Sequence, residues 1–248
     1  MIKNILSIHL LSSHKTIQRQ KNCVETWLNG FNDYIFTTDI IEGSYNQISH
    51  TQDSNYPFSC NVKQLEEMNR IIQNKLYEKF EWFFFGDDDL VMNIDKVLEL
   101  LQNEKLLIDK IVMHQLANKY YQIPILSNLN LKYAVLGSFA SLGHESSVYP
   151  SGGAGFFIHG DVFKNCKPIK IAHPARKFVD VLVGDWMKEQ NIPMIWINGM
   201  TGCDPSEAGI DPRNPDHYEE IRKTWITFHR ISDFERMKLF NDIWKNKI

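Results

Sequence analysis

The sequence has 248 residues, with 27 Lys and Arg against 30 Asp and Glu, and 43% of its residues are hydrophobic. This ordinary globular composition excludes a disordered or collagen-like chain, and the near-neutral charge argues against a nucleic-acid-binding protein. No window reaches the roughly 20 apolar residues that a membrane-spanning helix needs. We therefore expect one globular domain over residues 1–248 with a sizeable core.

The first half of the chain alternates predicted strands and helices. Apolar runs and three- or four-residue apolar spacing predict a strand at 5–11, a helix at 16–28, a strand at 34–38, a polar loop at 43–58, a helix at 62–80, an aromatic strand at 81–85, a helix at 94–102 and a strand at 110–114. Such alternation predicts an α/β sandwich with a mostly parallel sheet. Ligands of such sheets bind at the carboxyl ends of the strands.

The second half is less regular. It predicts a loop at 137–150, a glycine-rich turn and apolar run at 152–158, a helix at 179–190, a strand at 193–197, an irregular stretch at 204–218, a strand at 225–231 and a closing helix at 233–248. The four cysteines lie far apart and form no CxxC pair, which fits neither a zinc site nor a disulfide scaffold. A reducing, cytosolic setting is the simplest interpretation.

The closing helix carries an apolar stripe beside basic residues. The stripe consists of Phe234, Met237, Phe240, Ile243 and Trp244. One interpretation is that this helix packs onto its own domain. The other is a peripheral contact with an anionic membrane, such as a bacterial inner membrane, through a basic amphipathic helix.

Asp87, Asp88 and Asp89 are adjacent carboxylates at the end of the aromatic strand. Because like charges repel, each costs free energy when it is ionised beside the others, and a divalent cation relieves that repulsion. Oxygen ligands suit Mg²⁺ or Mn²⁺, and such a metal can stabilise a diphosphate leaving group. A solvated acidic turn is an equally good interpretation of these residues taken alone.

Two further segments could contribute to a site. Gly152, Gly153, Ala154 and Gly155 permit close backbone approach to a ligand, although an ordinary tight turn explains the same pattern. Asp180 stands among apolar residues, where desolvation would raise its basicity and suit a general base. Asp is also a favoured helix N-cap, and a helix is predicted to begin there.

Together these segments resemble a known family. The segments are Arg19 with Glu25-Thr26-Trp27, Trp82 to Asp89 with Asn93, Ser151 to Phe156, Asp180 to Gly184, and Ile226 to His229. They come in the order seen in the Fringe-like inverting β1,3-glycosyltransferases, the group that includes Fringe and the core 1 galactosyltransferase. The resemblance runs from about residue 5 to residue 231 and implies a GT-A fold, a Rossmann-like α/β sandwich around a mixed, mostly parallel sheet. It also implies a UDP-sugar donor and Mn²⁺, or Mg²⁺ in its place.

The resemblance also implies roles for individual residues. Asp89, His229 and Asp87 would hold the metal, and Asp180 would be the catalytic base. The donor would be contacted by a wider set, namely Arg19, Asp39, Asp87, Asp88, Gly152, Gly153, Ala154 and Gly155. The reaction would then be a single displacement that inverts the anomeric carbon, with no carboxylate nucleophile.

The sequence departs from the family at three points. Asn61 stands where Fringe has a lysine, with Lys63 nearby, and the stretch between Cys60 and Trp82 is longer. The membrane anchor and stem of eukaryotic members are missing, which favours a bacterial, cytosolic enzyme of surface-glycan synthesis. There are two alternatives. One is a non-catalytic carbohydrate- or nucleotide-sugar-binding module, which the presence of both Asp180 and His229 disfavours. The other is a metal phosphohydrolase, which would need more carboxylate or histidine metal ligands than the sequence offers.

Overall fold

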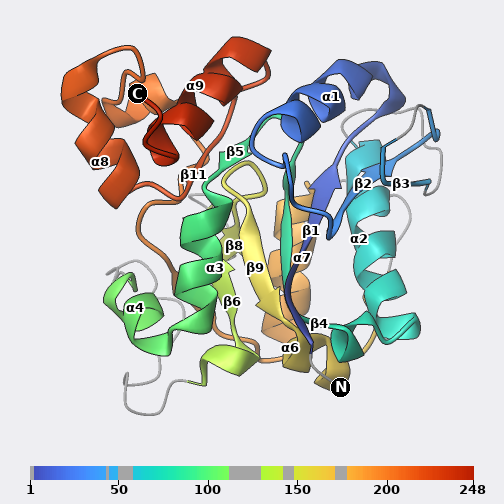
Figure 1. The fold of residues 1–248 in the computed structure, drawn as a ribbon. Helices are drawn as coiled ribbons and strands as arrows, with labels where there is room; N and C mark the ends of the chain where they lie inside the picture. The colour runs from blue at the N-terminus through green and yellow to red at the C-terminus, as the bar shows by residue number, and fades with distance from the viewer. Residues whose placement is uncertain (1–2, 43–44, 50–57, 112–129, 142–147, 171–177) are drawn as a thin grey trace.

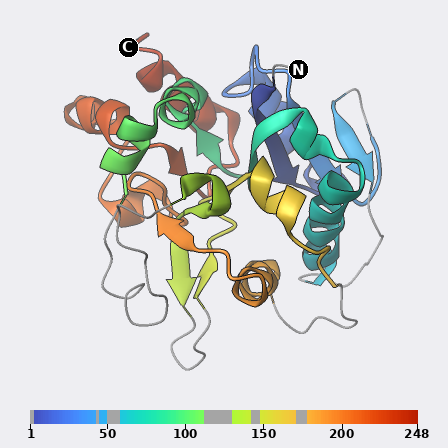
Figure 2. The same ribbon diagram turned by 90° about the horizontal axis from the view of Figure 1, so that it is seen from below.

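A seven-stranded sheet runs through the middle of the molecule, with helices on both faces (Figures 1 and 2). The computed structural model describes residues 3–42, 45–49, 58–111, 130–141, 148–170 and 178–248. The sheet order is β10-β6-β9-β4-β1-β2-β3. Its strands are β1 (Asn4–Leu11), β2 (Tyr34–Thr38), β3 (Gln47–Ser49), β4 (Phe80–Asp87), β6 (Val135–Gly137), β9 (Phe156–His159) and β10 (Met194–Trp196).

The sheet is mixed but mostly parallel. Strand β1 pairs in parallel with β2 and β4, and β9 is antiparallel to both of its neighbours, β4 and β6. Strands β2 and β3, and β6 and β10, also pair in parallel. The α/β sandwich around a mixed, mostly parallel sheet, which the GT-A expectation describes, is therefore confirmed.

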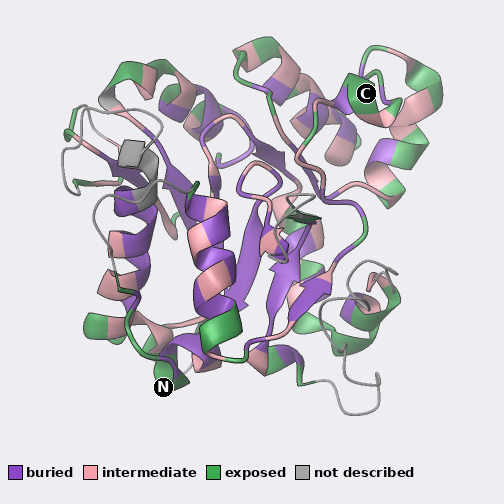
Figure 3. Ribbon diagram, turned by 180° about the vertical axis from the view of Figure 1, so that it is seen from behind, coloured by how far each residue is buried: buried purple, intermediate pink, exposed green. Residues whose placement is uncertain are grey.

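The aromatic strand β4 supplies both cores of the sandwich. Successive strand residues point to opposite faces, so Trp82 and Phe84 join one apolar cluster while Phe83 and Phe85 join the other. The first cluster is covered by α1 (Ile17–Glu25), α3 (Ile94–Gln102), α4 (Glu104–Asp109), α8 (Tyr218–Lys223) and α9 (Phe234–Trp244). The second is covered by α2 (Phe58–Gln73), α6 (Gly160–Asn165) and α7 (Val179–Glu189). Figure 3 shows the buried strands between these helices.

Shorter elements complete the described chain. Two small antiparallel sheets pair β5 (Val91–Met92) with β11 (Thr227–Phe228), and β7 (Phe139–Ser141) with β8 (Val148–Pro150). The 3₁₀ helices are η1 (His14–Thr16), η2 (Leu76–Glu78), η4 (Leu131–Tyr133), η5 (Pro205–Ala208) and η6 (Pro215–His217).

Several predicted boundaries were wrong. The helix expected at 62–80 ends at Gln73, because Lys75 takes a left-handed conformation (φ 52°) and Phe80 already belongs to β4. The loop expected at 43–58 contains the edge strand β3, and the loop expected at 137–150 contains β7 and β8. These strands have three residues each, too few to show a clear alternating pattern.

Two predicted strands are much reduced. The strand expected at 225–231 is only β11, which pairs outside the main sheet. In the strand expected at 110–114, the described part forms a single antiparallel bridge, between Ile111 and Ile197. Residues 112–114 lie outside the described chain. The helix expected at 16–28 ends at Glu25.

The apolar stripe of α9 packs onto the domain. Met237, Phe240 and Ile243 are fully buried in the first core cluster, and the indole N–H of Trp244 donates to the carbonyl oxygen of Ile221 at 3.1 Å. The other two residues of the stripe, Phe234 and Trp244, are half-buried. The interpretation that the helix packs onto its own domain is therefore confirmed for the middle of the stripe, and peripheral membrane contact stays a prediction. In the described residues, no helix has the length and apolar character needed to cross a bilayer.

This packing makes α9 important for stability. The ring of Phe240 lies 4.7 Å from that of Phe228 and has no exposed surface, so Phe240→Ala should lower the free energy of unfolding by about 3–5 kcal/mol. Lys238→Ala on the exposed side of the same helix should leave the free energy of unfolding nearly unchanged, because exposed ion pairs such as Lys238–Asp242 contribute little. Urea denaturation of both variants measures the difference; a Phe240→Ala cost below about 1 kcal/mol would contradict the buried position.

Candidate functional site

The acidic segment predicted from sequence lies at the carboxyl end of β4, beside a strand that is distant in sequence. Asp87 is the last residue of β4, and the chain continues from Asp89 into β5. Strand β5 pairs with β11, and two backbone hydrogen bonds extend this pairing. The N–H of Ile231 donates to the carbonyl oxygen of Asp89 at 2.8 Å, and the N–H of Asn93 donates to that of Ile226 at 2.9 Å. This pairing places His229, the residue after β11, against the acidic segment.

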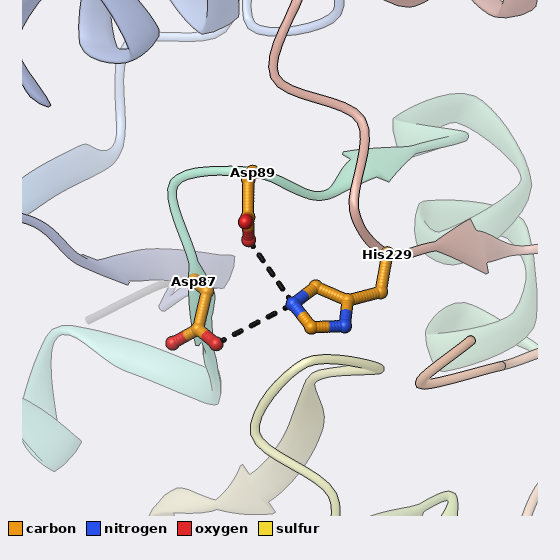
Figure 4. Close-up of side chains that lie close together, drawn as sticks. All are labelled: Asp87, Asp89 and His229. Carbon is orange, nitrogen blue, oxygen red and sulfur yellow. Dashed lines mark ion pairs between the residues drawn. The ribbon is translucent and has the colours of Figure 1, made fainter. Parts of the chain in front are cut away.

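Asp87, Asp89 and His229 form one cluster (Figure 4). His229 Nε2 lies 3.1 Å from Asp89 Oδ1 and 3.7 Å from Asp87 Oδ2. One ligand atom from each of the three residues lies within 4.8 Å of the others. The structure therefore brings together the three side chains that the sequence analysis assigned to a metal.

The backbone sets which nitrogen of His229 faces the carboxylates. Its Nδ1 lies 2.9 Å from the carbonyl oxygen of Gly202, which can only accept a hydrogen bond, so Nδ1 carries a proton. Nε2 then offers either a lone pair or, in the protonated ring, a second N–H. Asp89 Oδ1 is buried, and among the residues that the structure describes it has a hydrogen-bond donor only in that second case. A neutral His229 leaves both atoms free to bind a cation.

The cluster carries a charge conflict. Burial, followed by the charges of Asp89 and Asp180, raises the pKa of Asp87 to about 7, although His229 acts in the opposite direction. Burial would also raise the pKa of Asp89, but the hydrogen bond and charge of His229, together with Arg19, outweigh it and lower that pKa. Burial opposes protonation of His229, yet Asp89 holds the pKa of this histidine above its usual value.

A divalent cation fits these residues. Two carboxylate oxygens and one imidazole nitrogen converge, and no other described residue donates a hydrogen bond to the buried Asp89 Oδ1. Carboxylate oxygens with one imidazole suit Mn²⁺, and Mg²⁺ prefers oxygen alone. Asp87, Asp89 and His229 are the residues that would hold such an ion.

Asp180 lies beside this cluster. It is the second residue of α7, whose N-cap is Phe178, so the alternative interpretation of Asp180 as the helix cap is wrong. The backbone N–H of Gly152 donates to Asp180 Oδ2 at 3.2 Å. Burial nevertheless raises the pKa of Asp180. The neighbouring glycines Gly152 and Gly153 lie against Asp180 and His229 respectively, so Asp180 is one backbone turn away from the cluster.

The glycine-rich turn separates Asp180 from His229. A Cβ atom on Gly152 would lie 2.8 Å from Asp180 Oδ1, and one on Gly153 would overlap the His229 ring. The turn closes with a hydrogen bond from Gly155 N to Gly152 O at 3.0 Å, and Gly155 has φ +77°. The tight-turn interpretation is therefore confirmed, and the glycines also allow both side chains to approach the same backbone.

Asp88 points away from the cluster. Its side chain is buried, and its Oδ2 accepts hydrogen bonds from Ser12 Oγ at 2.7 Å and Thr16 Oγ1 at 2.6 Å. Arg19 Nη1 lies 3.4 Å from Asp88 Oδ1 and 3.3 Å from Asp89 Oδ2. The structure thus divides the three adjacent carboxylates into two that face His229 and one that faces the interior.

The remaining residues of the predicted site lie around the same edge of the sheet. Asp39 directly follows β2, and Thr38 Oγ1 donates to its carboxylate at 3.2 Å. Ala154 is buried, and its carbonyl oxygen accepts from Thr227 at 2.7 Å. Lys63 is also buried, with Nζ 2.5 Å from the carbonyl oxygen of Ser12.

Sequence reasoning missed Ser12, Thr16 and Gly202. Ser12 directly follows β1, whose carboxyl end lies next to that of β4, so its place at the end of a strand was a usable signal. Gly202 contributes only a backbone carbonyl to His229, and no side-chain pattern could reveal it.

No protein-family model matches the sequence, and no curated protein matches it. Among solved structures, one similar chain is described as a glycosyltransferase involved in the glycosylation of the major capsid of PBCV-1. The two chains are 17% identical, the match covers 94% of this chain and 98% of the other, and the TM-score is 0.39. A TM-score this low carries no argument about fold or function.

The cluster predicts a metal affinity that depends on His229. The variant His229→Ala removes one of the three protein ligands. Its dissociation constant for Mn²⁺ should be at least about tenfold higher than that of the wild type, which corresponds to about 1.4 kcal/mol of binding free energy. His217→Ala is the matched control, because His217 lies in η6 and accepts a hydrogen bond from Asp211 N at 2.9 Å. Electron paramagnetic resonance of free Mn²⁺ measures both constants; equal constants for the wild type and His229→Ala would remove His229 from the site.

Proposed function

We propose that this chain is an inverting, metal-dependent glycosyltransferase that moves a sugar from a UDP-sugar to an acceptor hydroxyl. The observation that carries the proposal is the convergence of a cluster of three potential metal ligands and a separate half-buried carboxylate, Asp180, on the two sides of one glycine-rich turn. The order of these segments along the chain resembles that in Fringe-like enzymes. That resemblance further supports a β1,3 linkage.

Asp180 is the proposed general base. A base of this reaction must take the proton of an acceptor hydroxyl while the oxygen attacks the anomeric carbon. Because burial raises the pKa of Asp180, its carboxylate binds a proton more readily than an exposed aspartate does. The N–H of Gly152 holds one of its oxygens, which fixes the direction in which the other can accept the proton.

The metal cluster is proposed to lie at the donor diphosphate. Asp87, Asp89 and His229 would hold Mn²⁺, or Mg²⁺ in its place. When bound, this ion supplies positive charge that offsets the charge developing on the leaving UDP. Asp39 at the end of β2 and the turn at residues 152–155 are proposed to line the donor site, since they lie at the same edge of the sheet.

The proposal is tested with Asp180→Asn. Each UDP-sugar of a panel is mixed with the protein with and without Mn²⁺, and thermal unfolding is measured. UDP release is then measured with a mixture of free mono- and disaccharides present, which supply the acceptor hydroxyl for the transferred sugar. The variant should keep the metal-dependent stabilisation by the donor, because that shift reports binding. Its rate of UDP release should fall by about 10²-fold or more, because a positioned general base typically accelerates a reaction by about 10²–10⁴-fold.

Glu189→Gln is the matched control, since Glu189 lies exposed at the other end of α7. It should behave as the wild type in both assays. Normal turnover of Asp180→Asn would remove Asp180 from the base role. Donor binding by a wild-type chain that never releases UDP would instead favour a binding module, and no metal-dependent stabilisation by any UDP-sugar would refute the proposal.

A further inference from the structure

We infer that Arg19 is a positioning residue for the metal ligand Asp89, and that Asp88 anchors Arg19, so that neither acts primarily as a nucleotide contact. This inference rests on the proposed metal site of Asp87, Asp89 and His229. It assigns to Arg19 and Asp88 a role that differs from the donor contact implied by the family resemblance.

Asp88 is fixed in place by its surroundings. Only 4% of the residue is exposed, and its Oδ2 accepts two short hydrogen bonds, from Ser12 and Thr16. Hydrogen bonds from hydroxyl groups to a carboxylate are among the stronger ones in proteins. A rotation of Asp88 toward the metal cluster would break both bonds, so this carboxylate stays inward.

The direction of the Ser12 hydrogen bond is set by two glutamines. Gln47 Nε2 donates to Gln20 Oε1 at 2.5 Å, which leaves the amide nitrogen of Gln20 to donate to Ser12 Oγ at 2.8 Å. Since Ser12 Oγ already accepts that bond, its single hydrogen is available for Asp88. The buried side chains behind Asp88 thus form a connected network rather than isolated contacts.

Arg19 connects this fixed carboxylate to the metal cluster. Its Nη1 lies between Asp88 Oδ1, at 3.4 Å, and Asp89 Oδ2, at 3.3 Å. The other oxygen of Asp89, Oδ1, is the one that lies 3.1 Å from His229. The two oxygens of Asp89 therefore have separate partners, and the contact of Oδ2 with Arg19 keeps Oδ1 directed at the cluster.

The arrangement depends on the shape of the arginine as well as its charge. The Arg19 side chain is 39% exposed, so its position at Asp89 depends on the buried anchor, Asp88. Both contacts come from one nitrogen, Nη1, whose place is set by the rigid, planar guanidinium. A lysine has a compact ammonium group on a flexible stem, which is held less firmly at the same point. Groups that orient metal ligands typically change metal affinity about 10–100-fold when they are replaced.

The test is the dissociation constant for Mn²⁺ of Arg19→Lys, which keeps the positive charge and removes the guanidinium. Free Mn²⁺ is measured by electron paramagnetic resonance, without any sugar nucleotide, so the result does not depend on activity. The constant should rise about tenfold. Arg222→Lys is the control, because Arg222 Nη1 bonds Asn246 at 2.6 Å in an exposed position, and it should leave the constant unchanged.

A second pair of variants tests the anchor without changing any charge. Thr16→Val loses the hydroxyl that donates to Asp88, whereas Thr16→Ser retains it. We expect Thr16→Val to weaken Mn²⁺ binding several-fold and Thr16→Ser to restore it, with the thermal midpoint without metal showing that each variant is folded. This pair gives an answer even if Arg19→Lys does not fold.

The outcomes separate this inference from the proposed function. Arg19→Lys and Thr16→Val proteins that bind Mn²⁺ as tightly as the wild type would overturn the inference while leaving the metal site intact. A wild-type chain that binds no Mn²⁺ would overturn the metal site, and with it both the inference and the metal dependence of the proposed reaction.

Discussion

The candidate site depends on the antiparallel pairing of β5 with β11. Each strand has two residues, and the backbone hydrogen bonds from Ile231 to Asp89 and from Asn93 to Ile226 extend the pairing on both sides. This short pairing joins the end of the central strand to a segment near the end of the chain, which brings His229 to Asp87 and Asp89. The core beneath it, where Phe228 packs on Phe240, holds the pairing in place.

The second constraint is the repulsion among three adjacent carboxylates. The fold reduces it by turning Asp88 inward to Ser12, Thr16 and Arg19, while Asp87 and Asp89 remain together at His229. Burial and neighbouring charge still raise the pKa of Asp87 to about 7. A bound divalent cation would favour the ionised form of Asp87, because an opposite charge stabilises a carboxylate. The geometry of the backbone thus creates a strong local preference for positive charge.

Much of the architecture could be predicted from the sequence because it follows from periodicity. The strand at 34–38 and the helix at 94–102 have the predicted bounds, and α7 ends one residue before its predicted end. The aromatic run of β4 identified the central strand, and the acidic segment at its end identified one part of the site. Strands of two or three residues, such as β3, β5 and β11, have no periodic signal of their own. They form because longer elements bring their backbones together.

The same distinction holds for the site. Residue type indicated that the segment Asp87 to Asp89 could bind a metal and that Asp180 could act as a base. The family resemblance added His229, but no pattern indicated that Asp88 faces inward. Its direction depends on Ser12 and Thr16, which come from a different part of the chain.

The most direct test of the metal centre is anomalous diffraction from a crystal grown with Mn²⁺. We expect one strong peak in contact with Asp89 and His229 Nε2, with Asp88 still bonded to Ser12 and Thr16. The absence of a peak there, with Mn²⁺ bound elsewhere, would contradict a metal site at Asp87, Asp89 and His229.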